Sequence, residues 1–357
     1  MTKKLFYPFI IIYNLAIIYL LSSTPISPHE AYLLFEGQDL VAQLIRLSFN
    51  SVDFWSLRVV FYMFGTLNIY LYYQLSKIYF KSINDVYFST TIFMLLPGII
   101  TSMALANISV IIITVVLLFI LAHKKGYRYV EILLMIILLF VHNEAIIFFI
   151  SILIYSIYQK ARLLLYSSII LSIISIYLYS FMIGGKPSGH FIEIFGLYSA
   201  IFSPFLFIYF LFAIYKAKSN RDILWYISFI SLIFSLLLSI RQRIYITEFT
   251  SYVLVGLILM IQVYHNSLRV RLKEYQKVYK RIFYFMMSSL IISSLIIIFH
   301  QSIFNFIDNP KKHFAYDIYE IYWVSQKIDK GLLSCYDTNK SKKKYQLKYY
   351  KINSCKR

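Results

Sequence analysis

The sequence predicts an all-α polytopic membrane protein with about 11 transmembrane helices, and three observations indicate this class. Sixty per cent of the 357 residues are apolar and 14% are charged, and the mean hydropathy is +0.69. Apolar runs of about 20 residues, the length that crosses a bilayer core, recur along the chain. The net charge of +19 then fits basic cytoplasmic loops facing anionic lipid, and it does not indicate a nucleic-acid partner.

The apolar runs define the predicted spans in chain order. They lie near residues 5–21, 54–74, 86–104, 106–122, 129–141, 145–158, 163–183, 196–214, 223–240, 245–264 and 282–300. Lys3 and Lys4 precede the first run, but the following "LLSSTPIS" lacks a small-x-small cleavage site, so we expect this span to be retained.

The fifth and sixth spans are short, and residues 129–158 could instead form one long helix interrupted at His142 to Glu144. Basic residues lie on both sides of the stretch, which places both of its ends on the cytoplasmic side. We therefore expect a hairpin with His142 and Glu144 at an outer turn, where their polar groups reach water.

The distribution of Lys and Arg supports an N-terminus in the cytoplasm and a C-terminus in the periplasm of a bacterial inner membrane. With eleven spans, the cytoplasmic segments hold 18 of these residues and the outer loops hold five. The remaining 12 lie in residues 301–357, which the same topology places outside. Whole domains cross membranes regardless of their charge, so this tail is an accepted exception.

Residues 1–300 thus form the predicted transmembrane domain, and residues 301–357 form a small periplasmic domain. Both cysteines, Cys335 and Cys355, lie in this tail. A pair confined to a periplasmic segment is typical of a disulfide, although two unpaired thiols remain an alternative. Their spacing matches no zinc site.

The first outer loop, residues 22–53, carries an unusual group of ionisable residues. Leu, Val and Ile recur at helical spacing over residues 33–49, which predicts a helix lying in the membrane interface. Pro25 and Pro28 end the first span and leave His29 and Glu30 at the start of this helix.

Several motifs in order along the chain resemble the GT-C fold polyprenyl-phosphate-sugar glycosyltransferases, in particular the bacterial aminoarabinose transferase and protein O-mannosyltransferase group. "PHEAYLLFEG" is similar to the family's acidic first-loop motif, and "FWSLRVVFYMFG" to the start of its second span. "FVHNEAIIFF" resembles its paired short helices, "IRQRIYITEFTSYVLV" its late "RY" motif, and "KKYQLKYYKI" a strand of its end domain. The chain has His29 where the family usually has Asp, and Asn107 where an acid is common.

The resemblance implies transfer of a sugar from a polyprenyl-phosphate donor to a lipid A, glycan or protein acceptor at the periplasmic face. A carboxylate would take the acceptor's proton, which makes Glu30 the candidate general base. Guanidinium groups would neutralise the leaving phosphate. The candidate substrate-binding residues are His29, Arg58, His142, Glu144, Arg241, Arg243 and Tyr245. No cofactor is indicated with certainty, and a divalent metal ion stays open.

Each of these residues also has a structural interpretation. Glu30 could be a solvated loop acid, Arg58 could pair with Asp53, and Arg241 and Arg243 could anchor the end of a span. His142 and Glu144 are more typical of a polar turn than of a catalytic pair.

Two other functions are compatible with this class of membrane protein. A polysaccharide polymerase or ligase usually has a long late outer loop rich in Arg and His, whereas the longest internal outer loop here is the acidic first one. A transporter would show repeated halves and helices interrupted by Gly or Pro. Ten Gly, seven Pro and no detectable repeat count against it.

Overall fold

The computed structural model describes residues 1–49, 54–179, 189–219, 221–241, 246–353 and 355. Within these ranges the chain is helical, without a β-strand. It divides into two compact units. The large unit comprises Met1–Pro8, Phe64–Ser102 and Ile108–Ser294, and the small unit comprises Phe9–Met63, Met103–Asn107 and Leu295–Arg357.

Three long helices contribute to both units: α1 (Lys3–Ser23), α4 (Phe54–Tyr79) and α16 (Lys273–Ile298). The other helices of the large unit are α5 (Ile83–Leu95), α6 (Pro97–Ala104), α7 (Ser109–Lys125), α8 (Arg128–Val141), η1 (Asn143–Ala145), α9 (Ile146–Gln159), α10 (Arg162–Tyr179), α11 (Phe191–Phe202), α12 (Pro204–Lys216), η2 (Ala217–Ser219), α13 (Ile223–Arg241), α14 (Ile246–Val253), η3 (Leu254–Gly256) and α15 (Leu257–Val270). The small unit adds α2 (Pro28–Phe35), α3 (Leu40–Ser48), α17 (His300–Ile303), η4 (Phe304–Phe306), η5 (Pro310–Lys312), α18 (Tyr316–Asp329) and α19 (Ser341–Tyr349).

Five helices of the described chain are long and apolar enough to cross a membrane: Lys3–Ser23, Arg162–Tyr179, Ile223–Arg241, Phe249–Val270 and Lys273–Ile298. Two bent pairs, α5 with α6 and α11 with α12, raise the number to seven if each pair counts as one span. The helices therefore fit a multi-pass membrane protein, and the predicted total of eleven spans is not confirmed. With 14 residues each, α8 and α9 are about 21 Å long, which is short of a bilayer core of about 30 Å.

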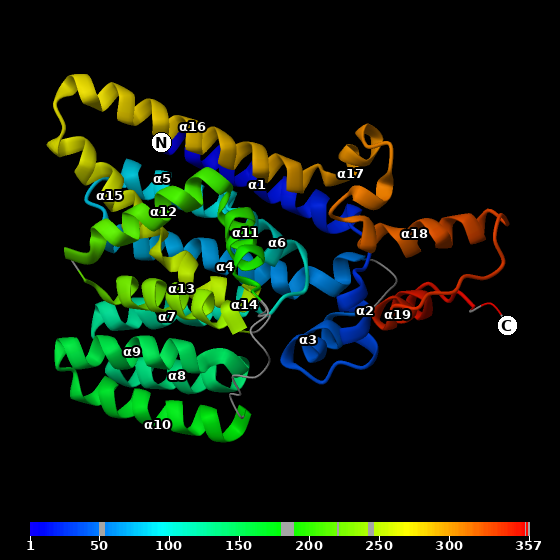
Figure 1. Ribbon diagram of the computed structural model, residues 1–357, viewed down its shortest axis with the longest axis horizontal. Coiled ribbons are helices and arrows are strands. Elements are labelled where there is room, and N and C mark those ends of the chain that lie inside the picture. The colour runs from blue at the N-terminus through cyan, green and yellow to red at the C-terminus, as the bar shows by residue number, and fades with distance from the viewer. Residues whose placement is uncertain (50–53, 180–188, 220, 242–245, 354, 356–357) are drawn as a thin grey trace. The chain divides into compact units, whose positions relative to one another are not determined.

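The predicted reversal at residues 142–145 is confirmed. His123, near the end of α7, lies 3.3 Å from Glu131 at the start of α8 and 2.9 Å from the Tyr155 hydroxyl near the end of α9. The first turn of α8 and the last turns of α9 therefore lie together, so the chain doubles back at η1. Figure 1 shows α7, α8, α9 and α10 running roughly parallel.

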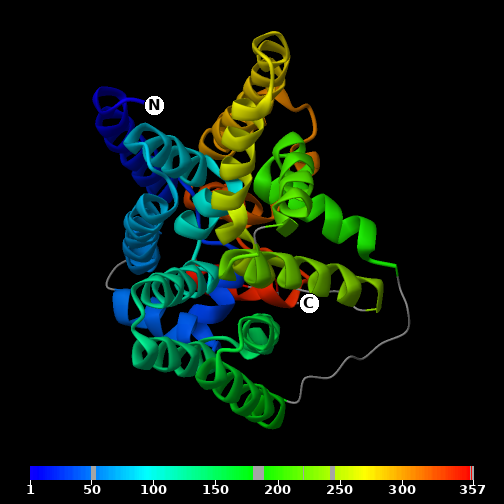
Figure 2. The same ribbon diagram turned by 90° about the vertical axis from the view of Figure 1, so that its left-hand side faces the viewer.

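Two predicted spans are interrupted by proline. The run 86–104 is broken between α5 and α6, which meet at 60°, and the run 196–214 is broken between α11 and α12, which meet at 100°. Pro97 and Pro204 begin the second helix of each pair, because proline fits the first turn of a helix but disrupts its interior. Later in the chain, α15 and α16 form the yellow hairpin in Figure 2.

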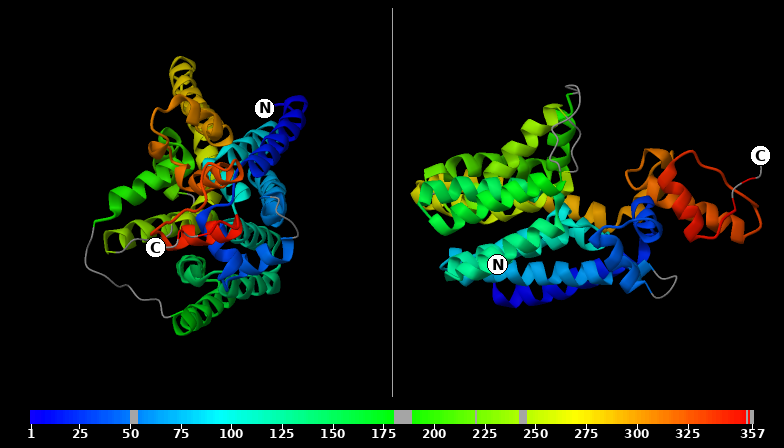
Figure 3. Two further views of the ribbon diagram at one scale, coloured as in Figure 1. Left: turned by 90° about the vertical axis from the view of Figure 1, so that its right-hand side faces the viewer. Right: turned by 90° about the horizontal axis from the view of Figure 1, so that it is seen from below.

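The small unit differs from two sequence predictions. The expected interfacial helix 33–49 is two short helices, α2 and α3, separated at Glu36 to Asp39. The expected strand in "KKYQLKYYKI" is the helix α19, which packs against α2. Figure 3 shows the orange and red tail beside the blue first loop, so the tail and this loop belong to one compact unit.

Candidate functional site in the first loop

Helix α2 begins with a reciprocal capping arrangement. The Ser27 hydroxyl accepts a hydrogen bond from the Glu30 backbone N–H at 3.1 Å, and the Glu30 carboxylate accepts one from the Ser27 N–H at 2.8 Å. Pro28 occupies the first helical position, where its missing N–H costs nothing. The sequence Ser-x-x-Glu before an apolar run is the signature of this capping box, and it identifies a structural role for Glu30.

Arg58, in the second turn of α4, lies beside this helix start with no exposed surface. Its Nε and Nη2 donate to the two Glu30 carboxylate oxygens at 2.8 and 2.7 Å. The remaining donors reach the backbone carbonyl oxygens of Thr24 at 2.7 Å, Pro25 at 2.9 Å and Leu21 at 3.3 Å. All five N–H groups of the guanidinium are thus directed at acceptors, and the arginine joins α4 to the chain that leaves α1.

The Glu30 carboxylate is equally engaged. Besides Arg58 and the Ser27 N–H, it accepts a hydrogen bond from the backbone N–H of Ala106 at 3.0 Å, and Glu30 is only 1% exposed. Burial alone would raise the pKa of Glu30, but the charge of Arg58 and the hydrogen bonds from Arg58, Ala106 and Ser27 outweigh it and lower this pKa below its ordinary value.

This geometry bears on the predicted chemistry of Glu30. A general base works best with a pKa near the working pH and with a lone pair that reaches the substrate. Glu30 is ionised and buried, and four donors surround its two oxygens. Its role as the base stays a prediction, while the contacts favour a structural role. Asp53, the other partner proposed for Arg58, lies outside the described residues.

His29 precedes Glu30 and is exposed on the first turn of α2. The Lys342 ammonium of α19 lies 3.5 Å from His29 Nδ1 and 5.8 Å from the ring centre of Tyr32. The Gln346 amide, also on α19, donates to the Ile26 carbonyl at 2.7 Å. The C-terminal helix α19 therefore contacts the start of α2 and the residues that precede it.

A second network, which the sequence did not suggest, holds the tail helices together. Lys343 on α19 is 4% exposed; its ammonium lies 2.6 Å from Asp317 and also pairs with Glu320, both on α18. Burial alone would lower the pKa of Lys343, but the two carboxylates outweigh it and raise this pKa above its ordinary value. The Lys343 ammonium and the two carboxylates thus connect α19 to α18.

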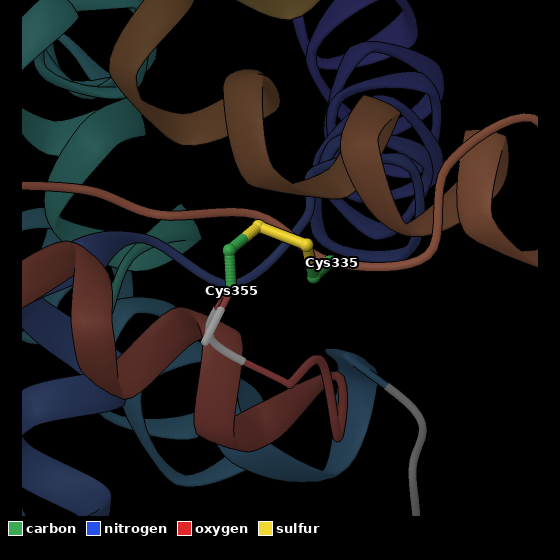
Figure 4. The surroundings of a disulfide bond; sticks show 2 residues. All are labelled: Cys335 and Cys355. Atoms are coloured by element: carbon green, nitrogen blue, oxygen red, sulfur yellow. A yellow bond between two sulfur atoms is a disulfide. The ribbon is translucent and has the colours of Figure 1, made fainter. Parts of the chain in front are cut away.

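The predicted disulfide is present in this tail. Cys335 and Cys355 are bonded to each other with their Cα atoms 5.0 Å apart, as Figure 4 shows. The bond joins the segment after α18 to the segment after α19, so it closes the part of the chain that contains α19.

The remaining candidates belong to the large unit. The expectation that His142 reaches water at the turn is wrong, because this residue is 3% exposed. Its Nδ1 lies 2.8 Å from the Tyr252 hydroxyl of α14, which is the geometry of a satisfied buried histidine. Glu144 lies in η1 at the turn. Arg241 is the exposed last residue of α13, and Arg243 and Tyr245 lie outside the described residues.

The helix breaks at Pro97 and Pro204 bring several polar groups of the large unit together. Gly98 of α6 lies against Ile201 of α11, so the broken pairs touch. Two serines of α16 reach the breaks: Ser294 donates to the Leu95 carbonyl, and the Ser289 hydroxyl lies 3.0 Å from that of Ser203. Ser203 is buried with a φ of 78°, a left-handed conformation that is strained for a residue with a side chain.

Among the described residues no group of three or more His, Cys, Asp or Glu could hold a metal ion. Comparisons with protein families, curated proteins and solved structures find no match to this chain.

Proposed function

We propose that this chain is an integral membrane glycosyltransferase that moves a sugar from a polyprenyl-phosphate donor to a lipid A, glycan or protein acceptor at the periplasmic face. The single observation that carries the proposal is the folded first loop. Glu30 ties its first helix, α2, to Arg58 of α4 and to the backbone of residue 106, and the motif of this loop is the one that resembles the GT-C family.

A fixed loop at the interface suits a donor that cannot leave the membrane. Helix α3 is amphipathic: it buries Val41, Ala42 and Ile45 within the protein and exposes Gln43 and Arg46. Holding a lipid donor and an acceptor in one geometry removes much of the entropic barrier to their reaction. We therefore assign the first loop the task of positioning.

The contacts suggest a division of labour within the motif. In the transfer, the acceptor oxygen bonds to the anomeric carbon and the bond to the lipid phosphate breaks. The phosphate leaves with the electron pair, and the acceptor's proton passes to the departing phosphate or to solvent. We assign Glu30 and Arg58 to positioning, because their donors and acceptors are engaged with each other and with backbone. His29, exposed one residue earlier, is our candidate for the side chain that faces the substrate, and Arg241 and Arg243 remain candidates for the phosphate.

Mass spectrometry of lipid-linked and modified glycans tests this proposal. Deletion of the gene should remove one glycan modification and increase its polyprenyl-linked donor. Complementation with His29→Ala should leave the modification at least about tenfold reduced, whereas Glu36→Gln, a change at an exposed acid of the same loop, should restore it. An unchanged glycan profile in the deletion strain contradicts the proposal.

A transporter of cell-envelope glycans is the second candidate, and the proline breaks favour it. Discontinuous helices that meet in the interior are a common way to build transport sites, and α5–α6 and α11–α12 meet beside a strained, buried Ser203. The sidedness of the lipid-linked glycan separates the two functions. A lost transporter leaves it in the cytoplasmic leaflet, whereas a lost transferase leaves it in the periplasmic leaflet without its product.

A further inference from the structure

The structure contains a cavity of about 520 Å³ in the large unit, far along the chain from the first loop. Helix α12 packs against α15, and the cavity opens where these helices end. Its lining residues are Lys216, Ala217, Leu259, Gln262, Val263, Asn266, Ser267, Val270 and Arg271. The volume lies within the range of small-molecule sites.

The lining combines positive charge with an apolar wall. It holds one lysine, one arginine, two amides and one hydroxyl, and none of the nine residues is acidic. Leu259 and Val263 are buried members of the wall. An anionic group joined to an apolar body matches this combination, because the charge can meet the cations while the body covers the aliphatic side chains.

The two cations are held in place by neighbours that leave donors for a ligand. The Lys216 ammonium donates to the Ser267 hydroxyl at 3.0 Å, and an ammonium has three donors. The Arg271 guanidinium lies 4.4 Å from the ring centre of Tyr279. A guanidinium has five N–H donors, and two of them can pair with two oxygens of one phosphate.

The surroundings identify the source of such a phosphate. The segment from Arg269 to Arg281 carries six basic residues and one acid, and by the basic-loop rule it lies at the cytoplasmic surface, where anionic lipids gather. We propose that this cavity binds the phosphate of an anionic phospholipid headgroup, with Lys216 and Arg271 as its ligands. The proposal depends on the membrane location alone and is independent of sugar transfer.

The test counts lipids bound to the full-length protein by native mass spectrometry in a neutral detergent. Phosphatidylglycerol should bind more tightly than phosphatidylcholine with the same acyl chains. Lys216→Gln combined with Arg271→Gln should weaken phosphatidylglycerol binding by at least about tenfold, the effect of losing one hydrogen bond to a charged group. The matched control is Lys280→Gln with Arg281→Gln, two exposed cations of α16 outside the cavity, which should change binding less than about twofold.

Asn266→Trp provides a second variant that keeps both cations and adds a large side chain to the cavity lining, and it should also reduce binding. Competition with glycerol phosphate and inorganic phosphate separates the sources. Failure of both to compete at millimolar concentration supports a lipid, whereas competition that depends on Lys216 and Arg271 assigns the cavity to a soluble phosphate and overturns the lipid assignment. Equal binding of phosphatidylglycerol by the double variant and its control would show that Lys216 and Arg271 do not bind the lipid phosphate.

Discussion

The Arg58 side chain has no exposed surface, so its guanidinium is buried. Its pairing with Glu30 determines which role the Glu30 carboxylate can have. Removing two charges from water costs several kcal/mol per ion, which is recovered when the pair is well aligned and every remaining donor and acceptor is satisfied. Here both Glu30 oxygens and all five Arg58 N–H groups have partners. At the residue scale, the Glu30 carboxylate therefore helps to hold the first loop in its conformation.

His300 gives the small unit a predicted dependence on pH. Its Nδ1–H donates to the Ile297 carbonyl at 2.9 Å, and its Nε2 lies 2.9 Å from the Tyr319 hydroxyl. Burial lowers the pKa of His300 below its ordinary value. The stability from the neutral ring is therefore complete above about pH 6.5 and is lost as the pH falls through the lower folded pKa.

Thermal unfolding between pH 7.5 and pH 5 measures this effect. The unfolding midpoint of the unmodified protein should fall over this interval, and the fall should be smaller in His300→Gln. Equal slopes in the unmodified protein and in His300→Gln would show that His300 contributes nothing.

Gly98 is the residue that lets the two broken helix pairs touch. A Cβ at this position would lie 2.4 Å from the Ile201 side chain, so Gly98→Ala should destabilise the protein by about 1–3 kcal/mol through overpacking. Gly196, on the same helix as Ile201, has nothing within 4 Å of an added Cβ, and Gly196→Ala should be neutral or stabilising by up to about 1 kcal/mol. Denaturant unfolding of the two variants compares them, and equal stability would refute close packing at the breaks.

At the scale of elements, apolar runs located most helices, and local chemistry decided where those helices break. Pro97 and Pro204 were visible in the sequence, but a run of apolar residues on both sides of each proline looks like one span. The tail shows a similar limit. Tyr345, Leu347 and Tyr349 alternate as in a strand, yet the structure buries Lys343, Gln346 and Leu347, which share one helical face.

The break between α2 and α3 is explained by one residue, a glycine that is visible in the sequence. Gly37 lies in the first half of the expected helix 33–49, and a Cβ there would lie 2.8 Å from the Leu33 backbone and from the Ala42 side chain. Only glycine permits this close approach. In contrast, the hairpin at 142–145 followed from the basic residues that flank it, and the disulfide from the confinement of both cysteines to the tail. The partners of Arg58 could not be predicted, because the Glu30 carboxylate and three backbone carbonyl groups lie 28 to 37 residues away in the sequence.

The disulfide is the prediction that belongs to the tail helices. Cys335 and Cys355 are separated by 20 residues, and closing a loop of this length should stabilise the small unit by about 3 kcal/mol in the chain-entropy model. Protein purified without reductant should contain no titratable thiol, and Cys335→Ser combined with Cys355→Ser should unfold at a lower temperature. Two reactive thiols in the native protein would contradict the pairing.

At the scale of the whole molecule, topology is the property that the proposed functions share. The basic loops predict that residue 143 faces the periplasm and residue 218 the cytoplasm, and both are exposed. Cysteines introduced at Asn143 and at Lys218 can be probed in intact cells with a membrane-impermeant maleimide. Labelling should occur at position 143 alone, and labelling at 218 with protection at 143 would invert the topology.

The buried pair between Glu30 and Arg58 remains the central claim, and unfolding of its variants tests it most directly. Removing one partner of a buried ion pair typically costs about 3–5 kcal/mol, so Glu30→Gln and Arg58→Met should each lower the thermal unfolding midpoint markedly. Since the two residues act on one another, the double variant should lose less than the sum of the single losses. Glu36→Gln, at an exposed acid of the same loop, should leave the midpoint unchanged. A Glu30→Gln protein that unfolds at the unmodified temperature would contradict the structural role and return Glu30 to the position of a catalytic base.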